Sequence, residues 1–258
     1  GGAVDLTAAP NGVSRIAGFG DAGYALTNEL ALAVSPVLTS FGIAVGGGNV
    51  ALTVNNGLGL TVEAGGSITT AVGGNVTLRA NEMAINGRVA APGGEINLRV
   101  AAAGVGVTLG GVAGGTLSLD AAALAQLGGS GPDGTSVPAA RLRITSANGI
   151  DLAGNVVLRD RFGALELEGT GAVTQSGGSL DVGRLVGRMT GGFAVDRAAA
   201  SNRIDELAVV VTGGAAGTVS VRATDPQATL LTVVNDTASG TDGISGTVTP
   251  STVTLAGN

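Results

Sequence analysis

Pairs of adjacent glycines recur along this chain of 258 residues, and each pair is followed by a small or polar residue and an alternating aliphatic run. The clearest copies lie at 47–52, 73–78, 93–98 and 114–119, and the last three begin 20 and 21 residues apart. A turn and a strand that repeat at this period are typical of a solenoid, in which each repeat buries its apolar face only against its neighbours. The repeat predicts an all-β chain that winds as a single parallel β-helix (β-solenoid) of about 20–21 residues per coil.

Weaker copies of the same unit fill most of the chain, so the predicted solenoid domain covers residues 1–258. Their short strands alternate between aliphatic residues, which are expected to point inward, and Thr, Ser, Arg, Asp or Glu. A β-sandwich would need hairpin turns and a thicker core, and propeller blades repeat at a longer period. Asn49 and Asn75, which each follow a glycine pair, are expected to form a ladder that satisfies backbone groups where the chain bends.

One segment departs from the repeat. Residues 120–128 read as a short helix with an aspartate N-cap and a glycine stop, and 129–138 read as a loop. Together they predict a helix–loop excursion over 120–140, which is either a decorated corner of the solenoid or a binding element. The candidate interaction residues of this excursion are Asp120, Leu124, Gln126 and Asp133.

Composition agrees with a thin aliphatic core and narrows the range of partners. The chain has 47 Gly but only four Phe, one Tyr and no Trp, so Val, Leu, Ile and Ala must fill the interior. Its net charge is −6 and its arginines form no basic stripe, which argues against a nucleic-acid partner. No apolar stretch approaches the roughly 18–20 residues that a membrane-spanning helix needs, so no transmembrane segment is expected. The chain opens without Met, and we expect it to be a piece of a longer protein or a filament subunit.

Catalytic chemistry has few residues to draw on, because the chain contains neither His nor Cys. A polysaccharide-active β-helix, a lyase or glycosidase, would have to use Asp, Glu and Arg, perhaps with calcium, and Asp151 is one further carboxylate available to it. Two glutamates of the densest cluster alternate on one strand, about 7 Å apart, which is wider than a retaining glycosidase requires but is possible for an inverting enzyme. The other interpretation is that these charges lie on the outside of the solenoid and pair across coils. The cluster consists of Arg159, Asp160, Glu166, Glu168 and Asp181.

No cofactor is expected, and calcium is the one ion to consider. The calcium-binding β-roll repeat needs Gly-Gly-x-Gly-x-Asp in tandem copies. Residues 177–181 lack the third glycine, and no tandem copy follows. Calcium at an isolated acidic corner remains the alternative.

Two runs, 73–80 and 201–209, resemble the repeats of filamentous-haemagglutinin-like exoproteins, which bacteria export by two-partner secretion. β-Helical autotransporter passengers share this repeat style. The resemblance implies a right-handed β-helix in the extracellular space or at the bacterial cell surface, acting as an adhesin, a filament or a display stalk. Its implied partners are other copies of itself, end to end or side by side, and host or matrix surface glycans. The leading hypothesis is therefore a non-catalytic structural and adhesive segment, with the polysaccharide-active enzyme as the alternative.

Overall fold

The computed structural model describes residues 2–114, 116–128, 137–212, 218–226, 231–237, 239–242, 244–246 and 253–257. The fold is nearly all β, with 56% of residues in strands and 3% in helix, and parallel stacked sheets form a β-solenoid of about nine turns. The predicted fold class is confirmed. The chain divides into two compact units: Gly1–Ala102, Ala122–Leu142 and Asp160–Phe162 form the first, and Ala103–Ala121, Arg143–Arg159 and Gly163–Asn258 form the second.

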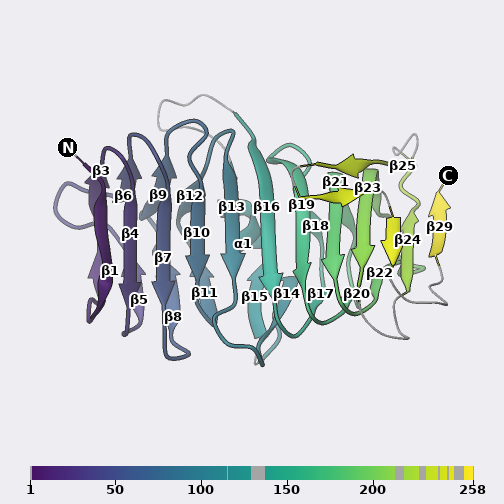
Figure 1. Cartoon of the computed structure of the whole chain (residues 1–258), viewed down its shortest axis with the longest axis horizontal. Coiled ribbons are helices and arrows are strands. Elements are labelled where there is room, and N and C mark those ends of the chain that lie inside the picture. Colours follow the sequence, from purple (N-terminus) through teal and green to yellow (C-terminus); the bar gives the residue numbers. More distant parts are fainter. Residues whose placement is uncertain are drawn as a thin grey trace. The chain divides into compact units, whose positions relative to one another are not determined.

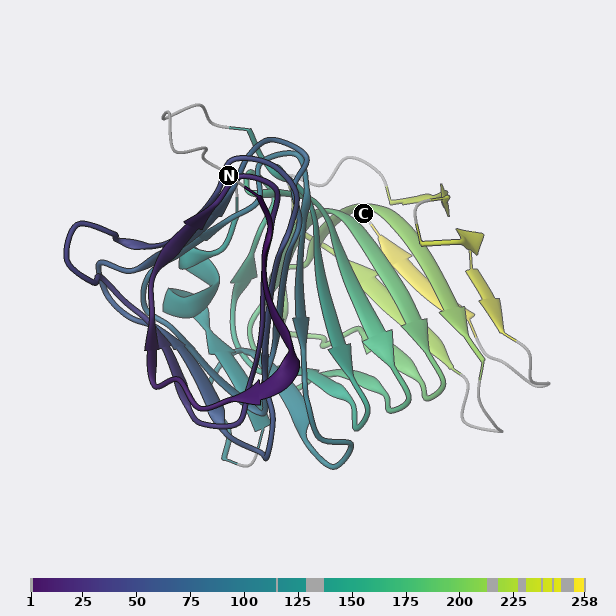
Figure 2. The ribbon, with the colours of Figure 1, turned by 60° about the vertical axis from the view of Figure 1, so that its left-hand side comes forward.

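The first unit is a three-sided solenoid, because each coil contributes one strand to each of three parallel sheets. Figure 2 shows these strands, in purple and blue, around a common core. Leu26, Leu52, Leu78 and Leu98 lie in register on successive coils and are at most 1% exposed. The strands are β1 (Val4–Asn11), β4 (Tyr24–Asn28), β7 (Val50–Val54), β10 (Val76–Arg79) and β13 (Glu95–Arg99) in one sheet, β2 (Arg15–Ile16), β5 (Leu32–Val34), β8 (Gly59–Val62) and β11 (Glu82–Ile85) in the next, and β3 (Gly18–Gly20), β6 (Gly42–Val45), β9 (Ser67–Thr70) and β12 (Arg88–Ala90) in the third.

The glycine pairs form the corners of this unit, and the two members of a pair have different tasks. Gly73 and Gly93 have φ angles of 84° and 64°, a left-handed conformation that glycine adopts without strain. Gly74 and Gly94 instead allow close approach of the coils. A Cβ on Gly94 would lie 2.0 Å from the carbonyl oxygen of Gly74 on the preceding coil. The first glycine of each of these two pairs is thus required for its backbone angle, and the second is required because a side chain would not fit between the coils.

The predicted asparagine ladder is present at the same corners. The Asn75 backbone N–H donates to Asn49 Oδ1 at 2.9 Å, and the Glu95 N–H donates to Asn75 Oδ1 at 2.7 Å. Each side chain therefore satisfies a backbone donor of the next coil, instead of pairing amide with amide. The first of these bonds spans 26 residues and the second 20.

Coil length varies with the turns between strands. The 26-residue coil has connections at 55–58 and 63–66, whereas the following 20-residue coil has the shorter connections 80–81 and 86–87. The expected 20–21 residues per coil therefore describe the shorter coils. The strands keep their register because the extra residues lie in the corners.

The predicted short helix is present as α1 (Ala121–Gln126). It buries Leu124, which is 3% exposed, and the following Leu127, which is 1% exposed. Leu127 forms a parallel bridge with Val89 of β12, and the Gly128 N–H donates to the Val89 carbonyl at 3.0 Å. The end of the helix is thereby held against β12, the last strand of the third sheet of the first unit.

The only tyrosine, Tyr24, is 6% exposed at the start of β4. Gly18 leaves room for its ring, since a Cβ there would lie 3.1 Å from Tyr24 Cε2. Burial raises the pKa of the Tyr24 phenol above its ordinary value, because the phenolate is poorly solvated in this position.

This burial predicts a loss of stability in alkali. Since the unfolded chain releases the Tyr24 proton at a lower pH than the folded chain, the stabilisation is complete below about pH 10 and is lost as the pH rises through the folded-state pKa. Urea unfolding between pH 9 and 11 should show a falling free energy of unfolding, and phenolate absorbance should report a pKa above that of free tyrosine. The variant Tyr24→Phe should flatten this slope. A phenol that titrates at or below pH 10 in the native chain would contradict the prediction.

The second unit has two facing sheets, with longer strands in one of them. Leu165, Leu185 and Leu207 lie in register in that sheet and are fully buried. Figure 1 shows its strands β21 and β23 side by side. The long-strand sheet contains β16 (Ala139–Ser146, in this unit from Arg143), β19 (Phe162–Gly169, in this unit from Gly163), β21 (Leu180–Met189), β23 (Arg203–Val211) and β25 (Thr232–Val233), with β18 (Val156–Val157) on β21 and β28 (Ile244–Gly246) on β23, and the second sheet contains β15 (Thr116–Asp120), β14 (Gly106–Gly110), β17 (Ile150–Leu152), β20 (Val173–Gln175), β22 (Phe193–Val195), β24 (Val219–Ala223) and β29 (Val253–Gly257).

A small antiparallel pair, β26 (Asn235–Asp236) and β27 (Thr241–Asp242), lies against the long-strand sheet, where β27 contacts β21 and β23. The adjacent row of outward-pointing residues, Glu166, Val186 and Ala208, is 0% exposed. Part of the outward-facing surface of the long-strand sheet is therefore shielded from solvent. No helix in the described part of the chain is long and apolar enough to cross a membrane, in line with the absence of such a stretch in the sequence.

Candidate functional site

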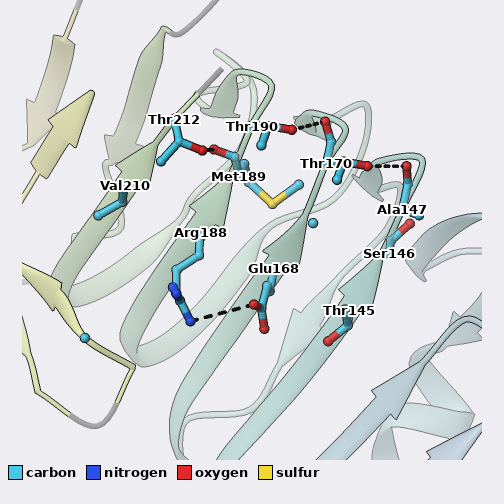
Figure 3. Close-up of a pocket in the computed structure, with 12 residues that line it drawn as sticks. Thr145, Ser146, Ala147, Glu168, Thr170, Arg188, Met189, Thr190, Val210 and Thr212 are labelled. Carbon is cyan, nitrogen blue, oxygen red and sulfur yellow. Dashed lines mark hydrogen bonds and ion pairs between the residues drawn. The ribbon is translucent and has the colours of Figure 1, made fainter. Parts of the chain in front are cut away.

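A groove of about 440 Å³ opens on the long-strand sheet of the second unit. Glu168, Arg188 and Val210 lie in register on β19, β21 and β23 and line it, and Thr145 of β16 extends the row. These side chains point outward because their neighbours Leu167 and Val209 are in the core. Figure 3 shows Glu168 and Arg188 next to each other in this groove.

Threonines just beyond the strand ends form the second wall. Thr170 Oγ1 donates to the Ala147 carbonyl at 2.5 Å, and Thr190 Oγ1 donates to the Thr170 carbonyl of the preceding coil. Thr212 Oγ1 makes a longer bond of 3.5 Å to the Met189 carbonyl. The Thr170 and Thr190 hydroxyls each donate their hydrogen to the backbone, so their oxygens can still accept a hydrogen bond from a ligand (Figure 3).

The charges of the groove balance without forming short hydrogen bonds. Glu168 Oε1 lies 3.7 Å from Arg188 Nη1, and Glu168 Oε2 lies 4.0 Å from Arg143 Nε. Both distances exceed those of an N–H···O hydrogen bond. Glu168 and Arg188 are 32% and 41% exposed. A bound molecule could therefore contact the hydrogen-bond donors of the guanidinium and the acceptor oxygens of the carboxylate at the same place.

The predicted charged cluster is divided between two ion-pair groups in the structure. Arg159 Nε donates to Asp181 Oδ1 at 2.7 Å, and the same guanidinium also pairs with Asp205 on the next coil. Burial lowers the pKa of Arg159, but its hydrogen bonds and charge interactions with Asp205 and Asp181 outweigh this effect and leave the pKa raised. This group is a cross-coil ion ladder, as the structural interpretation of the cluster expects.

Glu166 and Glu168 belong to the other group, with Arg143 beside both carboxylates. Glu166 is 0% exposed and its Oε2 lies 3.1 Å from Arg143 Nη2, which corrects the expectation that it lies on a solvated face. Asp160 is exposed in a turn and, within the described part of the chain, has no ion-pair partner. Of the five predicted cluster residues, only Glu168 lines the groove.

Asp151 lies on β17 in the second sheet of this unit, where a second groove of about 430 Å³ opens. Its carboxylate accepts hydrogen bonds from Thr174 Oγ1 at 3.0 Å and from the Ser176 hydroxyl and backbone N–H at 2.6 and 3.1 Å. Its acceptor capacity is thus largely used by the protein. Within the described residues, no three Asp or Glu side chains come together as a metal site would require.

The predicted interaction excursion is described only in part. Leu124 is buried and so is not presented to an outside partner. Gln126 is half-buried at the end of α1, and Asp120 ends β15. Asp133 lies outside the described residues.

Sequence reasoning missed the threonine wall, although the chain carries a signal for it. Thr170, Thr190 and Thr212 are each followed by glycine, at intervals of 20 and 22 residues. A Thr-Gly pair that recurs at the coil period places a hydroxyl at the same corner of successive coils.

Comparison with known proteins adds no assignment to this geometry: no family model matches the sequence, and neither a curated protein nor a solved structure matches the chain.

Proposed function

We propose that this chain is a non-catalytic structural and adhesive segment of a bacterial secreted or cell-surface protein, and that it forms a rigid shaft or filament by end-to-end continuation. A parallel β-solenoid of about nine turns supports this proposal, because stacked coils extend a structure by simple repetition. The cross-coil ion pairs of Arg159 and Arg184 support it as well, since they join charges of successive coils to one another.

The observation that carries the proposal is the open edge of the first unit. β1, β2 and β3 each stand last in one of its three sheets and have a strand neighbour on one side only among the described residues. Unpaired strand edges are templates for a further strand. Since all three sheets end at the same coil, this edge would accept a complete coil, either of the same polypeptide or of another copy.

The repeat style supports placing the chain among filamentous-haemagglutinin-like exoproteins or autotransporter passengers. The runs that resemble those families, 73–80 and 201–209, contain β10 and most of β23, and so belong to the regular coils. On this proposal the protein acts outside the cell, where it contacts other copies of itself and surface glycans. The family, the localisation and these partners are parts of the proposal.

The proposal predicts that the 258-residue chain associates through its edge strands. Light scattering over a range of concentrations should give an apparent mass that rises with concentration. The variant Asp5→Pro/Leu6→Lys should remain monomeric. The Val4 N–H donates to Gly23, and because alternate N–H groups of a strand point to opposite sides, that of Asp5 faces the open edge, where proline removes it. Lysine at Leu6 adds a charge to the same strand.

A matched control separates edge effects from added charge. Val72→Lys introduces the same lysine at an exposed corner of the first unit that is not in an edge strand, and it should associate like the unmodified chain. A chain that stays monomeric at every concentration, or that associates equally well with Asp5→Pro/Leu6→Lys, would contradict end-to-end continuation.

A further inference from the structure

We propose that the groove on the long-strand sheet binds a neutral saccharide, with Glu168 and Arg188 together holding a pair of adjacent hydroxyl groups. This inference rests on the adhesive part of the proposed function, since it assigns a site and a ligand class to the surface glycans named there. End-to-end continuation concerns the open edge of the first unit and is tested separately. It rests on the charge, hydrogen-bonding capacity and extent of the groove.

The paired charges select against charged ligands. A carboxylate brought to Arg188 would lie close to Glu168, and a cation brought to Glu168 would lie close to Arg188, so either ligand meets one like charge. A hydroxyl group both donates and accepts. Two adjacent hydroxyls can therefore donate to the Glu168 carboxylate and accept from the Arg188 guanidinium, and the 3.7 Å between the two groups leaves their hydrogen-bonding capacity available.

The walls extend this recognition beyond one pair of hydroxyls. The hydroxyl oxygens of Thr170 and Thr190 are acceptors that recur at successive coils. The row that begins at Thr145 and ends at Val210 crosses four strands, or roughly 14 Å at about 4.8 Å per strand spacing, which is room for about three sugar rings. Val210 and the threonine methyl groups offer apolar contact to ring C–H groups.

The groove beside Asp151 does not offer the same chemistry. The Asp151 carboxylate already accepts three hydrogen bonds from Thr174 and Ser176, and no arginine lines that groove. A polar groove alone therefore does not provide a site for adjacent hydroxyl groups. The Glu168–Arg188 groove differs in having a close pair of opposite charges that, among the described residues, make no short hydrogen bond to each other.

The test is a calorimetric or NMR titration of the full chain with three neutral hexasaccharides (cellohexaose, mannohexaose and xylohexaose) and with hexagalacturonate as the anionic comparator. We expect at least one neutral hexasaccharide to bind with a dissociation constant on the order of 1 mM, because no aromatic residue is present for stacking. Hexagalacturonate should bind at least tenfold more weakly. Arg188→Gln and Glu168→Gln should each weaken neutral-sugar binding about tenfold or more.

Two further variants keep the result interpretable. Thr190→Val retains the side-chain shape, removes the wall hydroxyl and should weaken binding severalfold even if the charge variants prove unstable. Arg15→Gln breaks the exposed Arg15–Glu63 pair of the first unit, at 3.2 Å, and should leave sugar binding unchanged. The inference is overturned if no neutral hexasaccharide binds at a concentration about ten times the expected dissociation constant. It is also overturned if hexagalacturonate binds more tightly than the neutral hexasaccharides, or if all three groove variants still bind the neutral sugar as the unmodified chain does. None of these results bears on association through β1, so the two proposals fail separately.

Discussion

Phe193→Ala is expected to lower the free energy of unfolding by about 3–5 kcal/mol, the range typical of a large aromatic residue removed from a core. Phe193 is the largest of the fully buried side chains and lies on β22, in the second sheet of the second unit. Its ring fills the space above Gly187 of β21, in the long-strand sheet, where a Cβ would lie 2.4 Å from the ring. Truncation therefore leaves a cavity between the two sheets.

Urea unfolding followed by circular dichroism measures this loss, and the chain offers a matched control. Phe19 is 62% exposed on β3, so Phe19→Ala should change the free energy of unfolding by less than about 0.5 kcal/mol. The reverse substitution, Gly187→Ala, should also destabilise, because it places a methyl group inside the ring's volume. Equal effects of Phe193→Ala and Phe19→Ala would show that the core between these sheets is not packed around Phe193.

The corners and core rows of this fold could be predicted from the sequence because they depend on neighbouring residues along the chain. Gly73 and Gly74 are recognisable as a turn, Asn75 follows them, and Val76 and Leu78 alternate into the core. All of these features occur within six residues. The stacking of coils then follows from their repetition, and so the parallel solenoid was predicted correctly.

Features that depend on distant segments could not be predicted in this way. Alternation correctly placed Glu166 and Glu168 on one face of β19, but it could not show that β27 contacts the strands β21 and β23 of the same sheet and that Glu166 is buried. The two glutamates, which look equivalent in sequence, therefore have different surroundings. Likewise, Leu124 reads as a surface residue of an excursion, and only its packing beside the Leu127–Val89 bridge shows that it belongs to the core.

Because Glu166 is buried, its ion pair with Arg143 is expected to contribute more to the stability of the fold than an exposed ion pair does. Glu166 Oε2 lies 3.1 Å from Arg143 Nη2, and Glu166 is 0% exposed whereas the arginine is 24% exposed. Val186, next to Glu166 in the row, is fully buried as well, so this carboxylate has no access to solvent in the folded chain. A buried carboxylate that loses the guanidinium 3.1 Å away loses a large part of what offsets the cost of its desolvation.

Arg143→Met should therefore lower the free energy of unfolding by about 3–5 kcal/mol, whereas Arg143→Met/Glu166→Leu should recover most of this loss, because the double variant also removes the buried carboxylate. The double-mutant cycle with Glu166→Leu, measured by urea unfolding, gives the coupling energy directly. Arg188→Met is the matched control: its partner Glu168 is 32% exposed at 3.7 Å, and the expected loss is below about 1 kcal/mol. If Arg143→Met and Arg188→Met cost the same, burial does not distinguish the two glutamates, and the outer face of β19 is solvated along its whole length.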